Sequence, residues 1–365
     1  MNTKIKNYVV CIVIPAFIVF FLVFSLLLPD KEFSDSERRR LAGAPELTMH
    51  SITNGRFMTA FEKYVQDQFP LREQFRSIKS VVSTEYLYKK DNNHLYETEG
   101  YLAYMEYPLN EKSLEYAAGR FDYISEKYLT DDNAIYFSLI PDKNMILGSQ
   151  SGHLFIDYKT FERAITEKIP YASVISIDDL LTKEDYYKTD THFRQERIVD
   201  VAQRILGEMD AEILADYETV LAKEDFYGVY HGQMARNYPS EPMYYLKGGN
   251  IDEFEVYDVQ NDKASEVYDI KRLEGKDPYE MYLSGPLSIV TIDNPRSDNN
   301  RNLIVFRDSF GSSIAPLLAE GYKKVTLIDT RYIHPDYLGQ FVSFENSDIL
   351  FLYSTLVLNN SETMK

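Results

Sequence analysis

The chain has 365 residues, of which 44% are hydrophobic and 14% aromatic, so it can bury one large core or two ordinary ones. Its formal net charge of −18 makes nucleic acid an unfavourable partner, because a phosphate backbone is bound through an excess of basic side chains. A single cysteine, Cys11, excludes a disulfide framework within the chain.

The N-terminal segment is a candidate membrane span. Residues 8–28, "YVVCIVIPAFIVFFLVFSLLL", carry no charge and are long enough to cross a bilayer as a helix. The basic residues Lys4 and Lys6 precede this run, which predicts that residues 1–7 are a cytoplasmic N-terminus. A cleavable signal peptide has a shorter apolar run followed by small residues, so the pattern favours an uncleaved signal anchor over the alternative.

This reading predicts a single-pass protein of the cell membrane whose main domain lies on the extracytoplasmic face. Because Cys11 falls inside the span, the exterior part has no thiol for a nucleophile or a metal site. Residues 29–54 are charged and lack a sustained period, which is typical of a stalk.

Helical periodicity begins after the stalk. Apolar residues recur at helical spacing between residues 55 and 90, and Pro70 is expected to divide this stretch into two helices. Residues 109–129 predict a further amphipathic helix.

Short apolar runs then alternate with helices. The runs at 134–140, 173–177, 303–306, 325–329 and 349–353 are typical of buried parallel strands. Helices are expected at 195–206, stopped by Gly207, and at 312–320, stopped by Gly321. The alternation predicts a three-layer α/β domain over residues 55–365, with a mainly parallel five-stranded sheet. Residues 208–300 interrupt it with Tyr- and Gly-rich, hairpin-like segments, interpreted as an insertion that covers the end of the sheet.

Ser309 occupies a position suited to nucleophilic chemistry. The stretch "LIVFRDSFGSSIAPLLAEGYKKVTLID" (303–329) reads as strand, tight loop, helix and strand, with Ser309 in the loop at the carboxyl end of the first strand. Ligands bind at that edge of an open α/β sheet, and the helix N-terminus favours the negative charge of an acyl-transfer oxyanion. The structural alternative is that Ser309 caps the helix and that Asp308 is a turn former.

A serine nucleophile needs a base and a group that orients the base. Asp190 and His192 in "TDTHFRQER" (189–197) stand before a predicted helix and can supply both members from one loop. The same residues also fit two metal ligands or polar residues at a helix start, and the short pattern leaves these alternatives open.

The ordered set of motifs carries a family resemblance. A membrane anchor, a charged stalk, "GRFMTAFEKYVQDQFPLREQF", "YKTDTHF" and "VFRDSFGSSIAPLLAEGYKKVTLIDTRY" follow one another over nearly all of residues 1–355. Together they resemble the DHHW family of bacterial cell-envelope proteins, which is similar to the alginate O-acetyltransferases AlgJ and AlgX and to SGNH hydrolases. Phe193 stands where the family name implies Trp, and Arg307 replaces the Gly that precedes "DS" in SGNH enzymes.

The resemblance implies Ser309 as nucleophile, His192 as general base and Asp190 as its orienter. The other histidines are dispersed, and the sequence has no phosphate-loop or dinucleotide fingerprint, so we expect no metal and no cofactor. It implies an SGNH-hydrolase-like fold and O-acetylation of a cell-surface polysaccharide. It further implies an acetyl donor delivered by a multi-pass membrane acyltransferase of the MBOAT type. Two alternatives are a carbohydrate esterase that uses the same triad, and a non-catalytic envelope scaffold or glycan-binding protein.

Secondary candidates lie near the same sheet edge. Arg331 and Tyr332 follow the strand at 325–329, so they can bind a sugar or an acetyl donor, or form an ordinary surface pair. The insertion offers three more candidates, Tyr230, His231 and Gln233. They can line the cleft or have a structural role in a hairpin.

Overall fold

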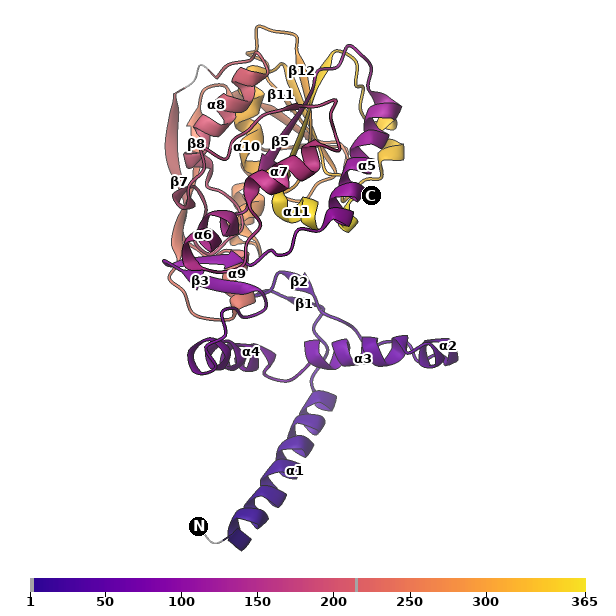
Figure 1. Cartoon of the computed structure of the whole chain (residues 1–365), viewed down its shortest axis with the longest axis vertical. Coiled ribbons are helices and arrows are strands. Elements are labelled where there is room, and N and C mark those ends of the chain that lie inside the picture. Colours follow the sequence, from indigo (N-terminus) through magenta and orange to yellow (C-terminus); the bar gives the residue numbers. More distant parts are fainter. Residues whose placement is uncertain (1–2, 214–215) are drawn as a thin grey trace. The chain divides into compact units, whose positions relative to one another are not determined.

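The computed structural model describes residues 3–213 and 216–365. Contacts divide the chain into two units, residues 1–92 with 232–237 and residues 93–231 with 238–365, which Figure 1 shows as ribbons. The boundaries expected from the sequence for anchor, stalk and catalytic domain stay predictions.

The first unit begins with a long apolar helix, α1 (Thr3–Leu27), in which residues 7–27 are long and apolar enough to cross a membrane. The other elements of this unit are β1 (Phe33–Ser34), β2 (Arg39–Arg40), α2 (Met49–Thr53), α3 (Arg56–Asp67) and α4 (Arg72–Val81). The predicted division at Pro70 is confirmed, because α3 ends before this residue and α4 begins after it.

The second unit is built on one twisted sheet (Figure 1), in which eight strands of the described chain pair in the order β10-β9-β11-β13-β12-β14-β5-β6. Strands lie at all five predicted places and form its parallel part: β5 (Ile135–Ile140), β6 (Ser173–Val174), β12 (Asn302–Arg307), β13 (Lys324–Ile328) and β14 (Ser347–Ser354). The prediction of a buried strand over 173–177 was wrong in extent, because β6 has two residues and both are exposed at the edge of the sheet. Three antiparallel strands extend it: β9 (Glu255–Asp258), β10 (Lys263–Ser265) and β11 (Ile289–Asp293).

Helices cover both faces of this sheet, which confirms the three-layer α/β class. One core contains residues of α8 (Val199–Glu208) and α10 (Gly311–Leu318), and the other contains residues of α5 (Glu111–Tyr128), α7 (Tyr158–Thr166) and α11 (Thr355–Asn359). Alternate residues of β12 serve the two cores: Leu303 and Val305 face the first, and Ile304 and Phe306 face the second. A strand that is buried on both faces needs a continuous apolar run, and this run made β12 predictable from the sequence.

The helix expected at 195–206 differs in its limits. Residues 195–197 form a 3₁₀ turn, and α8 runs from Val199 past Gly207 to Glu208. The buried Gln195 side chain explains the delayed start, because its amide donates to the carbonyl of Ser313 and accepts from the N–H of Leu246. The helix expected at 312–320 also differs in its limits. It begins one residue earlier, at Gly311, and ends at Leu318, where a 3₁₀ turn follows.

The interpretation of residues 208–300 needs correction at two points. Part of this stretch joins the main sheet as β9, β10 and β11 rather than covering it. The segment "FYGVYHGQM" contains helix α9 (Val229–Met234), and it connects the paired strands β7 (Tyr217–Phe226) and β8 (Glu241–Gly248). The remaining elements are the hairpin β3 (Leu95–Thr98) and β4 (Tyr101–Tyr104), and helix α6 (Lys143–Ser151).

Candidate active site

Ser309 lies where the sequence predicted it, in the tight turn between β12 and α10 at the carboxyl edge of the sheet. The turn is fixed by Asp308, whose carboxylate accepts hydrogen bonds from the N–H of Phe310 at 3.0 Å and of Ser354 at 2.8 Å. Ser354 ends the neighbouring parallel strand β14, so Asp308 ties the two strand ends together. Asp308 therefore shapes the turn that presents Ser309.

The structure brings the three predicted side chains into a continuous chain of contacts. His192 Nε2 lies 2.8 Å from Ser309 Oγ, and His192 Nδ1 lies 2.6 Å from Asp190 Oδ1 on the opposite side of the ring. A carboxylate at Nδ1 favours the tautomer that carries its proton there, which leaves Nε2 to accept the Ser309 hydroxyl hydrogen. This is the arrangement by which a serine hydroxyl is activated as a nucleophile.

Aromatic side chains set the plane of the imidazole. The ring of Tyr279 stacks on His192 with centroids 3.8 Å apart and an interplanar angle of 6°, while Phe310 contacts the ring at a tilt. The hydroxyl of Tyr279 donates to Ser313 on α10 at 2.8 Å, which ties the stacking ring to the helix after Ser309. Phe193 is fully buried and packs edge-to-face on Phe310, so this aromatic residue supports the loop from the core.

A buried lysine holds the loop that carries Asp190 and His192. Lys143 follows β5 at the same sheet edge, and its ammonium donates to the carbonyl oxygens of Tyr187 at 2.8 Å, Lys188 at 3.3 Å and Asp190 at 2.6 Å. The side chain is fully buried, and burial lowers the pKa of its ammonium. Three carbonyl acceptors and nearby carboxylates keep the buried charge solvated by the protein.

A buried glutamate binds the backbone N–H groups of the same loop. The Glu241 carboxylate, on β8, accepts from the N–H groups of Lys188 and Thr189, both at 3.0 Å. Lys143 thus binds carbonyl groups of residues 187–190 while Glu241 binds their N–H groups. We call this pair of buried charges, Lys143 and Glu241, the loop clamp.

Gly228 and the first residues of α9 also support Asp190 and its loop. The N–H of Val229 donates to Asp190 Oδ2 at 2.8 Å, and the N–H of Gly228 donates to Thr189 Oγ1 at 2.9 Å. A Cβ at position 228 would lie 2.3 Å from the carbonyl oxygen of Thr189 and 2.4 Å from Asp190 Cβ, so glycine is required by close approach. Tyr230 lies over the Lys143 ammonium, 5.2 Å from the ring centroid, and thus supports the clamp.

A cavity of about 250 Å³ opens beside the catalytic candidates. His192, Ser309, Arg331 and Tyr332 all line it, so both predicted substrate-binding residues reach the predicted site. The Arg331 guanidinium is held by hydrogen bonds to Asp329 at 2.9 and 2.7 Å, whereas Tyr332 is 46% exposed. A substrate in this cavity would meet a fixed cation and a freely accessible phenol ring.

Arg307, the residue before Asp308, is another buried charge at this edge. It is 1% exposed and lines the cavity, with Nη1 donating to the carbonyl of Asp308 at 3.2 Å and lying 3.8 Å from Asp329 Oδ2. Its Nε and Nη2 have no hydrogen-bond partner within the described residues, and burial lowers the pKa of the guanidinium. Its aliphatic part packs under Gly311, where a Cβ would meet Arg307 Cβ at 2.7 Å.

Comparison with known proteins supports the fold. No model of a protein family and no curated protein sequence matches the chain. Among solved structures, Bacillus cereus PatB1 with a sulfonyl adduct matches with a TM-score of 0.59 and 19% identity, over 72% of this chain and 95% of PatB1. A DHHW family protein from Eubacterium siraeum matches with a TM-score of 0.57 and 18% identity, over 75% and 95% of the two chains. The resemblance to the DHHW family is therefore confirmed at the level of the fold.

Proposed function

We propose that the chain is a membrane-anchored O-acetyltransferase of a cell-surface polysaccharide that works through an acetyl-Ser309 intermediate. The observation that carries this proposal is the contact chain from Asp190 through His192 to Ser309 beside an open cavity. Support for acetyl transfer as the reaction comes from the sequence resemblance to the DHHW family, whose fold this chain shares.

In the first half-reaction, Ser309 Oγ attacks the acetyl carbonyl of the donor while its proton passes to His192 Nε2. The tetrahedral intermediate collapses as the bond to the donor oxygen breaks, and His192 returns the proton to that leaving group. Asp190 stabilises the imidazolium and holds its orientation. The positive N-terminus of α10 and the cationic side chains at the cavity favour the negative charge that develops on the carbonyl oxygen.

In the second half-reaction, a sugar hydroxyl loses its proton to His192 and attacks the acetyl-Ser309 carbonyl. Collapse of the second intermediate releases the acetylated sugar, and the proton goes back from His192 to Ser309 Oγ. Arg331 and Tyr332 are placed to bind the sugar, because both line the cavity that contains Ser309. Water in place of the sugar hydroxyl would give an esterase.

The helix α1 is proposed to anchor the chain with residues 30–365 on the extracytoplasmic face. The acetyl group is then supplied from the membrane, in keeping with the MBOAT-type partner that the resemblance implies. Protease added to intact protoplasts is expected to digest the domain, and full protection would contradict this orientation.

An acceptor assay tests the activity. The full chain in nanodiscs is given an activated acetyl ester and an oligosaccharide of the host envelope, and acetyl is followed by mass spectrometry on sugar and in solution. Transfer to sugar that is lost in Ser309→Ala, but kept in the exposed control Ser149→Ala, supports the transferase. Release of acetate alone identifies the esterase, and no ester turnover identifies the scaffold.

A further inference from the structure

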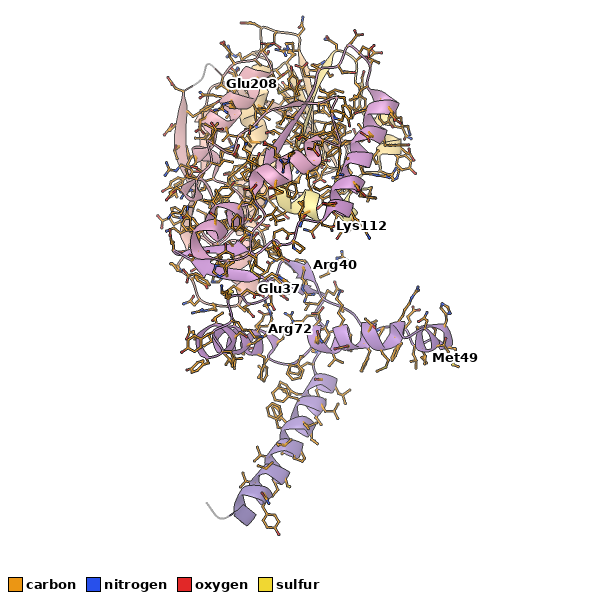
Figure 2. All side chains as sticks on the ribbon, in the orientation of Figure 1. Glu37, Arg40, Met49, Arg72, Lys112 and Glu208 are labelled. Carbon is orange, nitrogen blue, oxygen red and sulfur yellow. The ribbon has the colours of Figure 1, made fainter. Side chains whose placement is uncertain are left out.

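The first unit carries a continuous apolar surface that the described chain does not cover. We call residues 49–88 the α2–α4 segment; Figure 2 labels Met49 at its start. On α3, Met58 is 65% exposed and both Phe61 and Val65 are 42% exposed. The same exposure continues along α4 and the π-helical turn after it, at Leu71, Phe75, Ile78, Val82, Tyr86, Leu87 and Tyr88.

These side chains gather on one face of each helix. In α3 the large apolar positions are 57, 58, 61, 64 and 65, and in α4 with its flanking residues they are 71, 75, 78, 81 and 82. Both series follow the three- and four-residue spacing of an amphipathic helix. Scattered exposed apolar residues are common on soluble proteins, but a continuous stripe of this length marks a surface that contacts something apolar.

The burial pattern of these helices is inverted. The buried residue of α3 is Asp67, that of α4 is Ser80, and that of the following turn is Ser83. A helix packed on a water-soluble core buries its apolar stripe and exposes its polar side. Here the buried positions are polar, and the apolar positions are exposed or half-buried.

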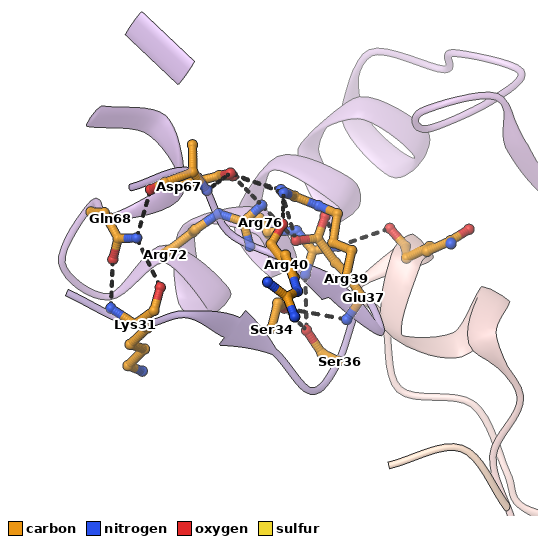
Figure 3. Close-up of polar contacts among 12 residues, drawn as sticks. Lys31, Ser34, Ser36, Glu37, Arg39, Arg40, Asp67, Gln68, Arg72 and Arg76 are labelled. Atoms are coloured by element: carbon orange, nitrogen blue, oxygen red, sulfur yellow. Dashed lines mark hydrogen bonds and ion pairs between the residues drawn. The ribbon is translucent and has the colours of Figure 1, made fainter. Parts of the chain in front are cut away.

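A network of charges holds the polar sides in place (Figure 3). Asp67 accepts hydrogen bonds from Arg39 at 2.9 and 2.6 Å, and Glu37 forms ion pairs with Arg72 at 2.6 Å and Arg76 at 3.3 Å. Arg76 also donates to the carbonyl oxygens of residues 232 and 233, which belong to the same unit. The outward direction of the apolar face is therefore fixed by specific contacts.

The apolar face is continuous with the candidate membrane span. The ring of Phe21, near the end of α1, stacks on Phe69 with centroids 5.1 Å apart and contacts Phe75 edge-on at 5.6 Å. The turn between α3 and α4 and the first part of α4 therefore contact α1 near its C-terminal end. The segment together with the following Lys89 and Lys90 carries seven lysine or arginine and four acidic side chains in a protein of net charge −18, which suits a surface of anionic lipid headgroups.

We propose that the α2–α4 segment lies in the interface of the bilayer that α1 spans, with its apolar face among the upper acyl chains. The proposal commits to lipid as the occupant, because the apolar face adjoins the span, and the segment with Lys89 and Lys90 carries an excess of basic side chains. It rests on the proposed membrane span, and it does not depend on the catalytic activity. Short helices with one apolar and one charged face bind membranes in this way.

Tryptophan fluorescence tests the proposal, because the natural chain has no tryptophan. The full chain is placed in nanodiscs of anionic lipid with brominated acyl chains, with one tryptophan at Phe61→Trp or Phe75→Trp. Matched controls on the same helices are Gln66→Trp and Ser77→Trp, which lie at exposed positions on other sides. The two test positions are expected to emit at shorter wavelength and to be quenched several-fold more strongly than the controls.

A tryptophan at a third position tests the membrane span separately from the interfacial placement of the α2–α4 segment. Val13→Trp lies within α1 and is quenched whenever the span is in the bilayer. Quenching at Val13 without quenching at Phe61 and Phe75 would overturn the interfacial placement while leaving the anchor intact. Blue-shifted but unquenched emission at the test positions would assign the face to a protein partner or a second copy, and would also overturn the proposal.

Discussion

The Lys143 ammonium donates a 2.6 Å hydrogen bond to the carbonyl oxygen of Asp190, the residue that orients His192. The interaction joins the carboxyl end of β5 to the loop that carries two members of the candidate triad. Lys143 does not line the described cavity, so we propose that it would affect the proposed reaction only through the position of the loop.

Removal of this charge should affect turnover more than substrate binding. In Lys143→Met the loop carbonyls lose their shared donor and His192 shifts relative to Ser309. A displacement of the base by about 1 Å lowers kcat by about 100-fold, with a smaller effect on KM. The exposed Lys159→Met on α7 serves as control, because surface ion pairs contribute little. Steady-state kinetics on variants with an intact circular dichroism spectrum test this prediction. An unchanged kcat in folded Lys143→Met would contradict the proposal that Lys143 positions the loop.

The lowered pKa of Lys143 predicts opposite pH trends for activity and stability. Burial lowers this pKa, so the ammonium loses its proton below the ordinary lysine value of about 10.4. The neutral amine has one donor fewer for the loop, so kcat should fall as pH rises through this window. The unfolded chain binds more protons there, so this group makes the folded state more stable as pH rises.

The carboxyl groups that face Lys143 are those of Asp142, Asp190 and Glu241, and burial raises the pKa of Asp142 to about 7. A pH–kcat profile measured together with thermal unfolding checks the two trends. A parallel fall of stability and activity would attribute the alkaline loss to unfolding and contradict the clamp.

Gly228 is predicted to be intolerant of a methyl group. In Gly228→Ala the Cβ collides with the carbonyl of Thr189 and with Asp190, which must move the loop. We expect a loss of about 10-fold or more in kcat/KM, and destabilisation of about 1–3 kcal/mol from the overpacked contact. Gly119→Ala on α5 meets nothing within 4 Å and is expected to retain activity and stability. Equal behaviour of the two variants in kinetics and thermal unfolding would contradict the tight packing.

Tyr332 should affect the acceptor step alone. The exposed ring lines the cavity, and its loss in Tyr332→Ala removes stacking area for a sugar without altering the triad. We expect KM for the acceptor to rise by about 5- to 10-fold, as for the loss of one aromatic contact, while acylation of Ser309 by the donor is unchanged. Donor-only burst kinetics and acceptor titrations separate the two steps; a reduced burst would place Tyr332 on the donor side.

The sequence revealed the parts of the site that local patterns encode. The central parallel strands are largely apolar runs, so the turn that carries Ser309 could be placed at the edge of the sheet from the sequence. The convergence of His192 with Ser309, 117 positions along the chain, was predictable because Ser309 lies at a predicted strand end, His192 precedes a predicted helix, and both belong to an ordered pattern that resembles a family. Their roles in catalysis stay predictions.

The supporting residues left no comparable signal. Lys143 stands directly after a buried strand, which is an unusual place for a lysine, but Glu241 is an ordinary residue at the start of a strand. Their pairing depends on the path of β8, and that path depends on packing between distant segments. The antiparallel strands β9 and β10 are short and exposed in part, so their sequences lack the apolar run that marked the central strands.

The most direct test of the catalytic proposal is detection of the acetyl group on Ser309. The full chain is mixed with an activated acetyl ester without acceptor, quenched in acid, digested and analysed by mass spectrometry. The proposed mechanism predicts acetyl on the peptide that contains Ser309, slower labelling by orders of magnitude in His192→Ala and a smaller loss in Asp190→Ala. Subsequent addition of the acceptor oligosaccharide should remove the label from the enzyme. Ester turnover with no label at Ser309, or labelling at the same rate in His192→Ala, would contradict the proposed triad.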